Sequence, residues 1–550
     1  MSPPPVRSLW GQIRAFDYVF WLCIFMELME RMAYYGVRLV APVYIVLATN
    51  EGGAGLSHAE KGTIYALWAA MQSWLPVFAG GLSDRFGYKR TIAVSVFLKA
   101  GGYALMATAD DFWSMVLGTQ LLAAGTGLFK PGIQGTMAHS IAKSPGTESM
   151  GWGLFYQSVN IGAAVAAFIP AFVREDLGLG WHGVFAACSL IVFSNLIPLF
   201  FYADPVDERQ TERDTRSVGR LMLDSLRELF TNPVLMAFIV ISAGFWFAFH
   251  QLFDMLPNYV DDWTDSSVLL SKMGELAGNA TWSADGAAGV MIPQERLLNI
   301  NAIMIMFTMF IFAWLSSKIS TLASTIVGMA IASFALISFV YTANVWVLLA
   351  GVAAFTVGEM LASPKRQEYM SSLAPPGKRA LYLGYANMPD GVGWVLGSLI
   401  AGSAYEVQGD KVNLTRDYVS ETASVASAEA WVDTVRAGSL DEKQLKELLE
   451  RTKTKELAQA VAQLEALNDR ALVTGVADAM PRGDVITWTV ANVPTLPDGT
   501  ATTPATLRDH LYQHYQPGQV WWPFVITGLA STVLMIGYDR WVRARNARAV

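Results

Sequence analysis

Cysteine and charge are both scarce in this sequence of 550 residues. The two cysteines, Cys23 and Cys188, lie in apolar runs with no metal-ligating residues spaced around them. Neither a disulfide framework nor a metal site is therefore indicated. Charged residues make up 15% of the chain and hydrophobic residues 53%, which is far from the composition of soluble proteins. A soluble fold could not bury that much apolar surface, so we expect an integral membrane protein.

Features of two other protein classes are also missing. The net charge of −7 is spread over the segments between apolar runs, and there is no basic stripe with interleaved aromatic residues. This argues against a nucleic-acid partner. No nucleophile with a base and an orienting acid, no metal-ligand cluster and no phosphate-binding loop can be assembled, so we expect no enzyme. The expected partners are a small molecule and the lipid bilayer.

Long apolar runs are abundant. A transmembrane helix needs about 20 apolar residues to cross about 30 Å of hydrocarbon. The first run is longer than the apolar core of a signal peptide, so we interpret it as a span. The predicted spans lie near residues 17–48, 60–82, 91–108, 113–138, 151–173, 182–202, 233–259, 297–316, 320–341, 345–372, 382–405 and 519–538. These spans predict an all-α membrane protein with twelve transmembrane helices in two six-helix bundles.

Polar segments divide these spans into domains. We predict an N-terminal bundle (1–202), a cytoplasmic linker (203–232), a C-terminal bundle (233–405, with an outer loop at 261–295), an extracytoplasmic insertion (406–518), and the last helix with its tail (519–550). Lys and Arg cluster in the tails and in alternate loops, which places both termini in the cytoplasm by the positive-inside rule. We expect a monomer in a bacterial plasma membrane, the inner membrane.

The insertion at 406–518 is polar and partly helical in pattern. Its stretch from Asp441 to Leu472 has the spacing of an amphipathic helix or a helical hairpin. We expect an extramembrane cap packed on the bundles, and the alternative is a ligand-capturing module. A remote alternative for the whole chain is a non-transporting membrane receptor that uses this insertion as its working part.

The first span carries ionisable side chains on one face. Because each residue advances a helix by about 100°, Glu27, Glu30, Arg31, Tyr34 and Arg38 share about a third of its circumference. An ionisable group at bilayer depth costs on the order of 2.5 to 3.5 kcal/mol, so this face must look into the bundle or a watery cavity. A structural ion pair between Glu30 and Arg31 is the alternative, but two acids and two bases exceed such a pair. We therefore interpret the face as functional.

Two lysines fall inside predicted spans. Lys130 follows closely spaced glycines and precedes a proline that loosens the helix. A buried ammonium needs a carboxylate, and we expect Glu27 or Glu30 to supply it. The proton affinity of such an acid changes when another charge arrives, which is what proton coupling requires. Lys99 has no motif around it, and we expect a structural or snorkelling role.

The second half adds polar groups at similar depth. These are His250 and Asp254 in the seventh span, Asn301 in the eighth and Glu359 in the tenth. Each alone could be a satisfied core group. Together they indicate a cavity shared by both halves, as in transporters built from two bundles.

Four stretches of the sequence match a known family. The motif Glu27-x-x-Glu30-Arg31 with Tyr34-Tyr35-Gly-x-Arg38 resembles the first-helix signature of the proton-dependent oligopeptide transporter family, a branch of the major facilitator superfamily. Three others agree in order and spacing: the loop Gly80-Gly-Leu-Ser-Asp84-Arg85-Phe-Gly87-Tyr-Lys89-Arg90, the fourth-helix Gly127-Leu-Phe-Lys130-Pro131 and the fifth-helix Phe155-Tyr156-Gln-Ser-Val-Asn160-Ile-Gly162. Many facilitators share the loop motif, whereas the first-helix and fifth-helix motifs together are specific.

The resemblance implies a major facilitator fold and symport of di- or tripeptides by alternating access, with protons as the coupling ion and no cofactor. It assigns proton coupling to Glu27, Glu30, Arg31 and Lys130. It assigns the peptide carboxylate to Arg38 and Lys130, the pocket wall to Tyr34 and Asn160, and the peptide amino end to Asn301 and Glu359. The loop residues Gly80, Asp84, Arg85, Gly87 and Arg90 would serve the conformational change.

Departures from the family pattern lie mostly in the second half. The family usually has an acid where His250 stands, and Asp254, one turn on, is a possible substitute in coupling. Ala386 replaces a pocket aromatic, and Ser73 stands where the family often has Tyr. These departures favour one alternative, a facilitator of the same fold that carries another small solute, such as a modified amino acid, a cell-wall fragment or a drug.

Overall fold

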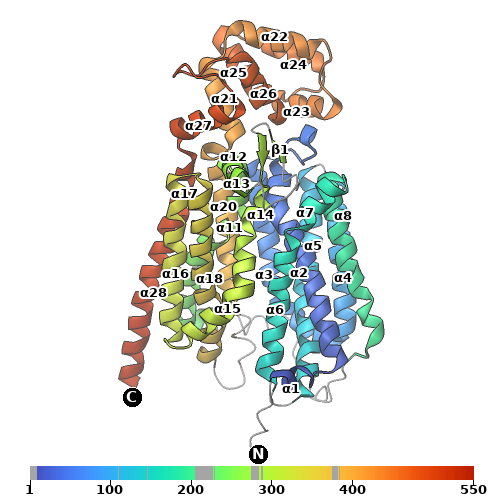
Figure 1. Ribbon diagram of the computed structural model, residues 1–550, viewed down its shortest axis with the longest axis vertical. Coiled ribbons are helices and arrows are strands. Elements are labelled where there is room, and N and C mark those ends of the chain that lie inside the picture. The colour runs from blue at the N-terminus through green and yellow to red at the C-terminus, as the bar shows by residue number, and fades with distance from the viewer. Residues whose placement is uncertain are drawn as a thin grey trace, which may run out of the picture.

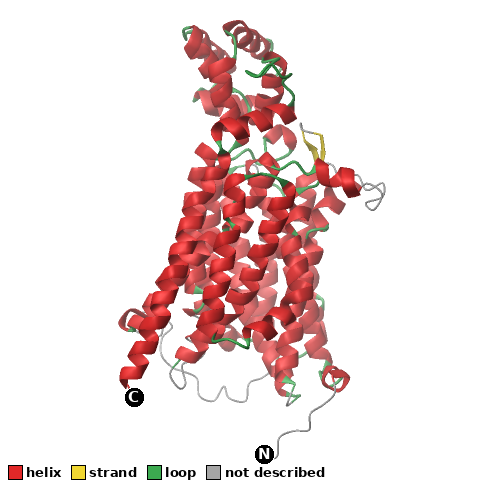
Figure 2. Ribbon diagram, turned by 60° about the vertical axis from the view of Figure 1, so that its left-hand side comes forward, coloured by secondary structure: helices red, strands yellow, loops and turns green. Residues whose placement is uncertain are grey.

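Helices dominate the structure, a computed structural model that describes residues 9–109, 111–144, 147–204, 227, 229–273, 284–286, 289–374, 382 and 385–549. They form two bundles beneath a smaller helical body, which we call the cap (residues 411–515; Figure 1). Helix α1 and the C-terminal end of α28 lie on the opposite side of the bundles, which we call the terminal side (Figure 1). Turning the molecule shows the cap as a continuation of the long axis of the bundles (Figure 2).

The first bundle follows the first six predicted spans. Its elements are α1 (Leu9–Ile13), α2 (Tyr18–Val46), η1 (Thr49–Glu51), α3 (His58–Phe86), α4 (Tyr88–Met106), α5 (Phe112–Ala142), α6 (Glu148–Ala166), α7 (Ile169–Ala171), η2 (Phe172–Asp176), α8 (Gly180–Phe193), η3 (Ser194–Leu196) and η4 (Pro198–Phe201). Helix α3 begins at a capping box, in which the Ser57 side chain accepts from the Glu60 N–H at 3.1 Å and Glu60 accepts from the Ser57 N–H at 2.8 Å.

The second bundle contains two broken spans. Its elements are α10 (Pro233–Phe249), α11 (Gln251–Asp254), α12 (Leu256–Trp263), α13 (Ser267–Met273), β1 (Ala284–Gly286), β2 (Gly289–Met291), α14 (Gln294–Leu298), α15 (Ile300–Ser316), α16 (Thr321–Ala335), α17 (Ile337–Tyr341), α18 (Val345–Leu373), α20 (Met388–Gln408), η6 (Pro517–Trp521) and α28 (Trp522–Ala549). The seventh span breaks at His250 and Met255, and the eighth at Asn299. The short antiparallel hairpin β1–β2 in the 261–295 loop was not predicted.

The predicted twelve-helix layout is confirmed. Among the described residues, eight helices are long and apolar enough to cross a membrane by composition alone. Helices α2, α3, α4 and α20 complete the bundles: α4 packs along α5, and α3 packs along α20 of the other half. Charged and polar residues lower the hydropathy of these four helices. The fold is all-α apart from the small hairpin.

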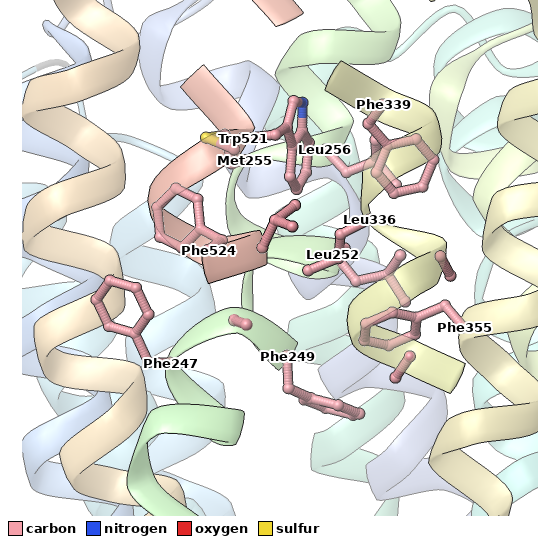
Figure 3. Packing of buried hydrophobic residues seen from close by; sticks show 14 of the residues in the cluster. Phe247, Phe249, Leu252, Met255, Leu256, Leu336, Phe339, Phe355, Trp521 and Phe524 are labelled. Atoms are coloured by element: carbon pink, nitrogen blue, oxygen red, sulfur yellow. The ribbon is translucent and has the colours of Figure 1, made fainter. Parts of the chain in front are cut away.

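Each bundle has its own apolar core, and the core of the second bundle continues into the part of the cap that lies against it. In the second bundle, aromatic and aliphatic side chains of the seventh, ninth, tenth and twelfth spans interlock, with Leu252, Leu336, Phe355 and Phe524 among them (Figure 3). The first bundle has one cluster toward the cap and another toward the terminal side. A separate cluster fills the cap. Since each bundle buries its own apolar surface, the halves can shift relative to each other without opening a core.

The cap is the predicted insertion and is helical throughout most of its length. Its helices are α21 (Lys411–Thr422), α22 (Val425–Arg436), α23 (Glu442–Thr452), α24 (Leu457–Glu465), α25 (Asp469–Ala479), α26 (Arg482–Asn492) and α27 (Pro504–Tyr515). The expected hairpin at Asp441–Leu472 is present as α23 and α24. The cap is anchored to the second half, where Arg508 of the cap pairs with Asp265 at 3.3 Å. Just before the cap begins, Trp263 Nε1 also donates to Gly409 O at 2.7 Å.

A buried ion pair holds the cap to Asp410, which lies in the short link between α20 and α21. Arg482 donates to both carboxylate oxygens of Asp410, at 2.7 and 2.9 Å, and Asp410 is fully buried. Burial opposes ionisation of Asp410, but the Arg482 guanidinium outweighs it and holds the pKa of Asp410 well below its usual range. A lowered carboxyl pKa contributes stability that is present above about pH 4 and is lost only below it. The pair therefore remains ionised at every pH relevant to uptake.

Arg482→Met is expected to lower the free energy of unfolding of the cap by about 3 to 5 kcal/mol, because it leaves the Asp410 carboxylate buried without its counter-charge. The measurement is the thermal unfolding midpoint of the purified protein at pH 7. Arg436→Gln is the matched control, since Arg436 makes its ion pairs on the exposed surface of the cap and such pairs contribute about 0 to 1 kcal/mol. Equal midpoints for the two variants would contradict this prediction.

The two halves are bonded to each other at the cap side. Gly62 of α3 and Gly402 of α20 allow close contact of the two backbones: a Cβ on Gly62 would lie 2.6 Å from Ser398 O. Asn258 Nδ2 donates to Pro42 O at 2.9 Å, and Gln294 Nε2 donates to Leu39 O at 2.7 Å. The bonds between halves found among the described residues gather here and near mid-bundle, so this conformation is closed at the cap side.

Candidate functional site

The ionisable face of α2 is fully buried and makes ion pairs. Glu30 pairs with Arg31 on its own helix and with Lys99 on α4, and Arg31 Nε lies 3.5 Å from Glu27 Oε1. Gly125 of α5 makes room for the lysine, because a Cβ there would collide with Lys99 Cγ. The expected ionisable cluster is therefore present, with one more member than the sequence predicted.

The structure narrows the alternatives that the sequence left open for two lysines. Lys99 has an exposed fraction of 0%, so its ammonium does not snorkel to a membrane surface. The Lys99 ammonium also pairs with the Glu30 carboxylate, which we expected to be a candidate partner of Lys130. The reason is geometric: α4 packs tightly along α5, and this packing directs Lys99 toward α2.

Lys130 instead faces a space between the two halves. Its side chain is exposed although it lies in the middle of a spanning helix, so water reaches it. It interacts electrostatically with Glu27 and Arg31 of the first half and with Asp390 and Arg366 of the second. Among the described residues, the Lys130 ammonium makes no ion pair within 4 Å. Its ammonium is therefore available to an anionic group that enters this space.

Tyr34 and Asn160 are both buried in the first half, on α2 and α6. The Tyr34 hydroxyl accepts from Gln72 Nε2 at 3.1 Å, and the Arg31 guanidinium lies 4.9 Å from the centre of its ring. Asn160 Nδ2 donates to the Tyr156 carbonyl at 3.1 Å. Both side chains are thereby fixed in orientation.

The structure brings Asn301 and Glu359 together. Asn301 Nδ2 donates to Glu359 Oε2 and to Thr356 Oγ1, each at 2.9 Å. Glu359 is half-buried, and no ion pair to it is found among the described residues. This carboxylate can accept hydrogen bonds from a cationic group, while Asn301 holds it in place.

His250 and Asp254, which lie one turn apart, have different partners. His250 Nε2 lies 3.2 Å from Asp390 Oδ1, and its ring stacks on Trp394 with centroids 4.6 Å apart. Arg366 also reaches Asp390, at 3.6 Å. Asp390 and Arg366 were not among the predicted site residues. They are 24 positions apart on α18 and α20, and no local pattern links them.

Asp254 joins the two halves. It accepts from Arg38 Nη2 at 2.5 Å, from Trp394 Nε1 at 2.8 Å and from Ser398 Oγ at 2.7 Å. The Arg38 guanidinium lies 4.4 Å from the centre of the Trp394 ring. Arg38, predicted to hold a substrate carboxylate, is therefore occupied by an internal carboxylate in this conformation.

The comparison with family models decides the superfamily. The model described as Major Facilitator Superfamily matches residues 20–398. The chain belongs to the Major Facilitator Superfamily.

Known proteins similar to this facilitator are transporters. The di-/tripeptide transporter of Lactococcus lactis subsp. cremoris is 28% identical over 195 residues, which are 35% of this chain and 37% of that protein. A solved structure of the peptide transporter POT with sulfate has a TM-score of 0.58 at 18% identity, covering 73% of this chain and 92% of that one. The nucleoside transporter NupG has a TM-score of 0.58 at 12% identity, covering 71% and 92%. The predicted resemblance is confirmed, and so is the expectation of a non-enzyme.

The loop that was predicted to serve the conformational change lies between α3 and α4. Gly87 has φ +93°, a left-handed value, and a Cβ there would collide with Asp204. The Asp204 carboxylate accepts from the Lys89 N–H at 3.3 Å, and Lys89 Nζ donates to Tyr202 O at 3.0 Å. The loop is thus bound to the end of the sixth span. Gly80 lies within α3 and Arg90 is exposed at the start of α4, while the side chains of Asp84 and Arg85 lie outside the described part of the chain.

Proposed function

We propose that this facilitator carries di- or tripeptides together with protons. The observation that carries the proposal is the placement of opposite charges on the two halves: exposed Lys130 in the first half and the Glu359–Asn301 pair in the second. A short peptide is a zwitterion, so its carboxylate suits Lys130 and its ammonium suits Glu359. A bound peptide would bridge the halves and favour closure around it.

The proton would be carried by the buried cluster of α2 and α4. Glu27 and Glu30 share Arg31, and Glu30 also shares Lys99. Lys130 interacts electrostatically with both Glu27 and Arg31. A peptide carboxylate that captures Lys130 changes the field at Glu27, and by linkage the proton affinity of the acids then depends on substrate occupancy.

Alternating access fits the bonding between the halves. With the cap outside the cell, as the loop charges predict, the cap-side contacts would close the outer entrance, as expected of an inward-facing state. Arg38 is bound to Asp254 in this state and would be released when the outer side opens. A carboxylate arriving from outside could then replace Asp254 at the guanidinium. Both termini would be cytoplasmic, in a bacterial inner membrane, and the expected monomer stays a prediction.

Uptake of labelled dialanine into proteoliposomes, with an acid exterior and an inside-negative potential, is the test. We expect acid-dependent accumulation in the wild type. Glu359→Gln is expected to raise the dialanine concentration at half-maximal uptake at least tenfold, because the peptide ammonium loses the carboxylate that binds it. The same variant should leave competition by N-acetylated dialanine unchanged, since that molecule has no ammonium. No uptake by a well-folded wild type would overturn the proposal.

A second candidate is a facilitator for a different small solute. The network of His250, Asp390 and Arg366 favours it, because it places a titratable ring and a guanidinium where the resemblance implies an acid. Ser73 and Ala386 also leave the pocket with fewer aromatic rings. If N-acetylated peptides compete better than free ones, Glu359 does not receive an amine and this candidate replaces the first.

A further inference from the structure

An arginine of the second half, Arg366, has no role in the proposed peptide transport, although it lies on the same helix as Glu359. It belongs to a charged stretch of α18 that follows Pro364. Arg366 lies seven positions after Glu359, so the two residues are on nearly the same face of the helix, about 10 Å apart along its axis. Since α18 runs from the cap side to the terminal side, Arg366 lies further from the cap than Glu359 does (Figure 1).

The ion pair between Arg366 and Asp390 is loose. Nη1 of Arg366 lies 3.6 Å from Asp390 Oδ1, which is longer than a normal hydrogen bond, and His250 Nε2 lies 3.2 Å from the same oxygen. The Trp246 ring, whose centre is 4.0 Å from the guanidinium carbon, supports the group from one side. Nε and Nη1 of Arg366 are enclosed, whereas Nη2 is accessible and donates no hydrogen bond among the described residues. Nη2 is therefore available to another acceptor.

Lys130 approaches this pair from the first half. It interacts electrostatically with both Arg366 and Asp390. Helix packing accounts for the approach, because a Cβ on Gly127 of α5 and a Cβ on Gly391 of α20 would contact the same turn of α3, at 3.0 and 2.5 Å. Helices α5 and α20 thus flank one level of α3, and they carry Lys130 and Asp390 at that level.

The charges at this level do not balance. Lys130 and Arg366 are two cations, and Asp390 is the one carboxylate that both of them approach among the described residues. The ionisable cluster of α2 and α4 contains two acids and two bases, so it neutralises itself. His250 adds no negative charge in either protonation state. One further carboxylate would complete the balance.

Arg38 cannot supply the second cation for a substrate carboxylate in this conformation. Its side chain is 4% exposed, and Asp254 holds it at 2.5 Å. The side chain of Arg366 is 12% exposed, and its pair with Asp390 is longer by about 1 Å. Releasing Arg366 also leaves Asp390 with His250, whereas releasing Arg38 requires the cap side to open.

We propose that Arg366 is a substrate-binding residue that, together with Lys130, binds the carboxylate of the transported solute while the cap side is closed. The carboxylate lies between the halves, and Asp390 holds Arg366 in position when the site is empty. Glu359 receives the ammonium two turns away on α18. That spacing of about 10 Å suits an extended tripeptide at about 3.3 to 3.6 Å per residue, and the flexible Lys130 side chain allows a dipeptide. The choice of a peptide as the solute rests on the proposed function.

Binding of matched acids and amides to the purified full chain tests the proposal. Dissociation constants are measured by calorimetry in chloride buffer for dialanine and for alanyl-alanine amide, which lacks the carboxylate. We expect the wild type to prefer dialanine at least tenfold. Arg366→Gln and Lys130→Gln should each reduce this preference at least fivefold, by weakening dialanine while the amide binds as before. Arg366→Lys keeps the charge and should hold the preference within about threefold of the wild type.

Two further variants distinguish substrate binding from a structural role. Lys365→Gln is the matched control, because Lys365 is the neighbouring cation on α18 and its Nζ is bound by Glu368 at 2.7 Å. It should keep the preference of the wild type. Asp390→Asn removes the internal carboxylate that competes for Arg366, so dialanine should bind at least threefold more tightly. A structural ion pair would instead weaken both ligands when either partner is removed.

Three results would overturn the proposal: a preference that is unchanged in Arg366→Gln, an equal loss of dialanine and amide binding in that variant, or a wild type that does not distinguish acids from amides. N-acetylalanine and its amide, which lack an ammonium, separate this inference from the proposed function. If the wild type takes up no dialanine but prefers N-acetylalanine to its amide, and Arg366→Gln loses that preference, the proposed function fails and this inference stands.

Discussion

Glu30→Gln is expected to abolish acid-driven accumulation of dialanine while peptide exchange across the membrane remains measurable. Glu30 is fully buried and is held by two cations, Arg31 and Lys99, so its charge is required to balance them. One proton moving through about 100 mV contributes roughly 2.3 kcal/mol, enough for about 50-fold accumulation since each factor of ten requires about 1.4 kcal/mol. A glutamine cannot bind and release that proton. The dialanine concentration inside the vesicles should therefore rise no higher than the concentration outside.

The measurement compares uptake under a proton gradient with counterflow in vesicles preloaded with unlabelled dialanine. Glu368→Gln is the matched control, because Glu368 is an exposed acid on α18 that has one cationic partner, Lys365, and no contact with the cluster of α2. It should accumulate peptide like the wild type. Accumulation by Glu30→Gln that equals the control would remove Glu30 from the coupling mechanism.

Much of the first half of the site could be predicted from the sequence. The acids and bases of α2 recur at helical spacing, and the high cost of charge at bilayer depth requires them to face inward. The partner of Glu30 could not be predicted in the same way. Lys99 and Glu30 are 69 positions apart, and their contact depends on how closely α4 approaches α5 at Gly125. That approach is a property of helix packing that no local pattern records.

The second half was predicted less completely. The pairing of Asn301 with Glu359 followed from the resemblance and is present in the structure. Asp390 was missed because its contact forms where the seventh span is interrupted: α10 ends at Phe249, and His250, the next residue, lies 3.2 Å from Asp390 on α20. A cavity under the cap was also missed. The insertion was expected to be a cap. Its amphipathic spacing does not reveal that the cap and both halves together line a cavity.

The ion pair between Arg38 and Asp254 should control the cap-side closure. Asp254→Asn leaves the Arg38 guanidinium buried between aromatic rings without a counter-charge, which costs about 3 to 5 kcal/mol in the closed state. In the open state water can solvate the guanidinium, and the cost disappears. The equilibrium between the two states is therefore expected to move toward the open state by about 100-fold or more, because each 1.4 kcal/mol is a factor of ten.

A cysteine on the cap-side face of α2 reports this shift. Val43 is 4% exposed and lies beyond Arg38 toward the cap, so Val43→Cys in a cysteine-free background should react slowly with an impermeant maleimide. Adding Asp254→Asn should accelerate the reaction at least tenfold and abolish accumulation of dialanine. Asp254→Glu keeps the charge and should restore slow labelling, which a general loss of stability would not. If Asp254→Asn labels no faster than its parent, closure depends on the backbone contacts of Gly62 and Gly402, and the ion pair serves substrate recognition alone.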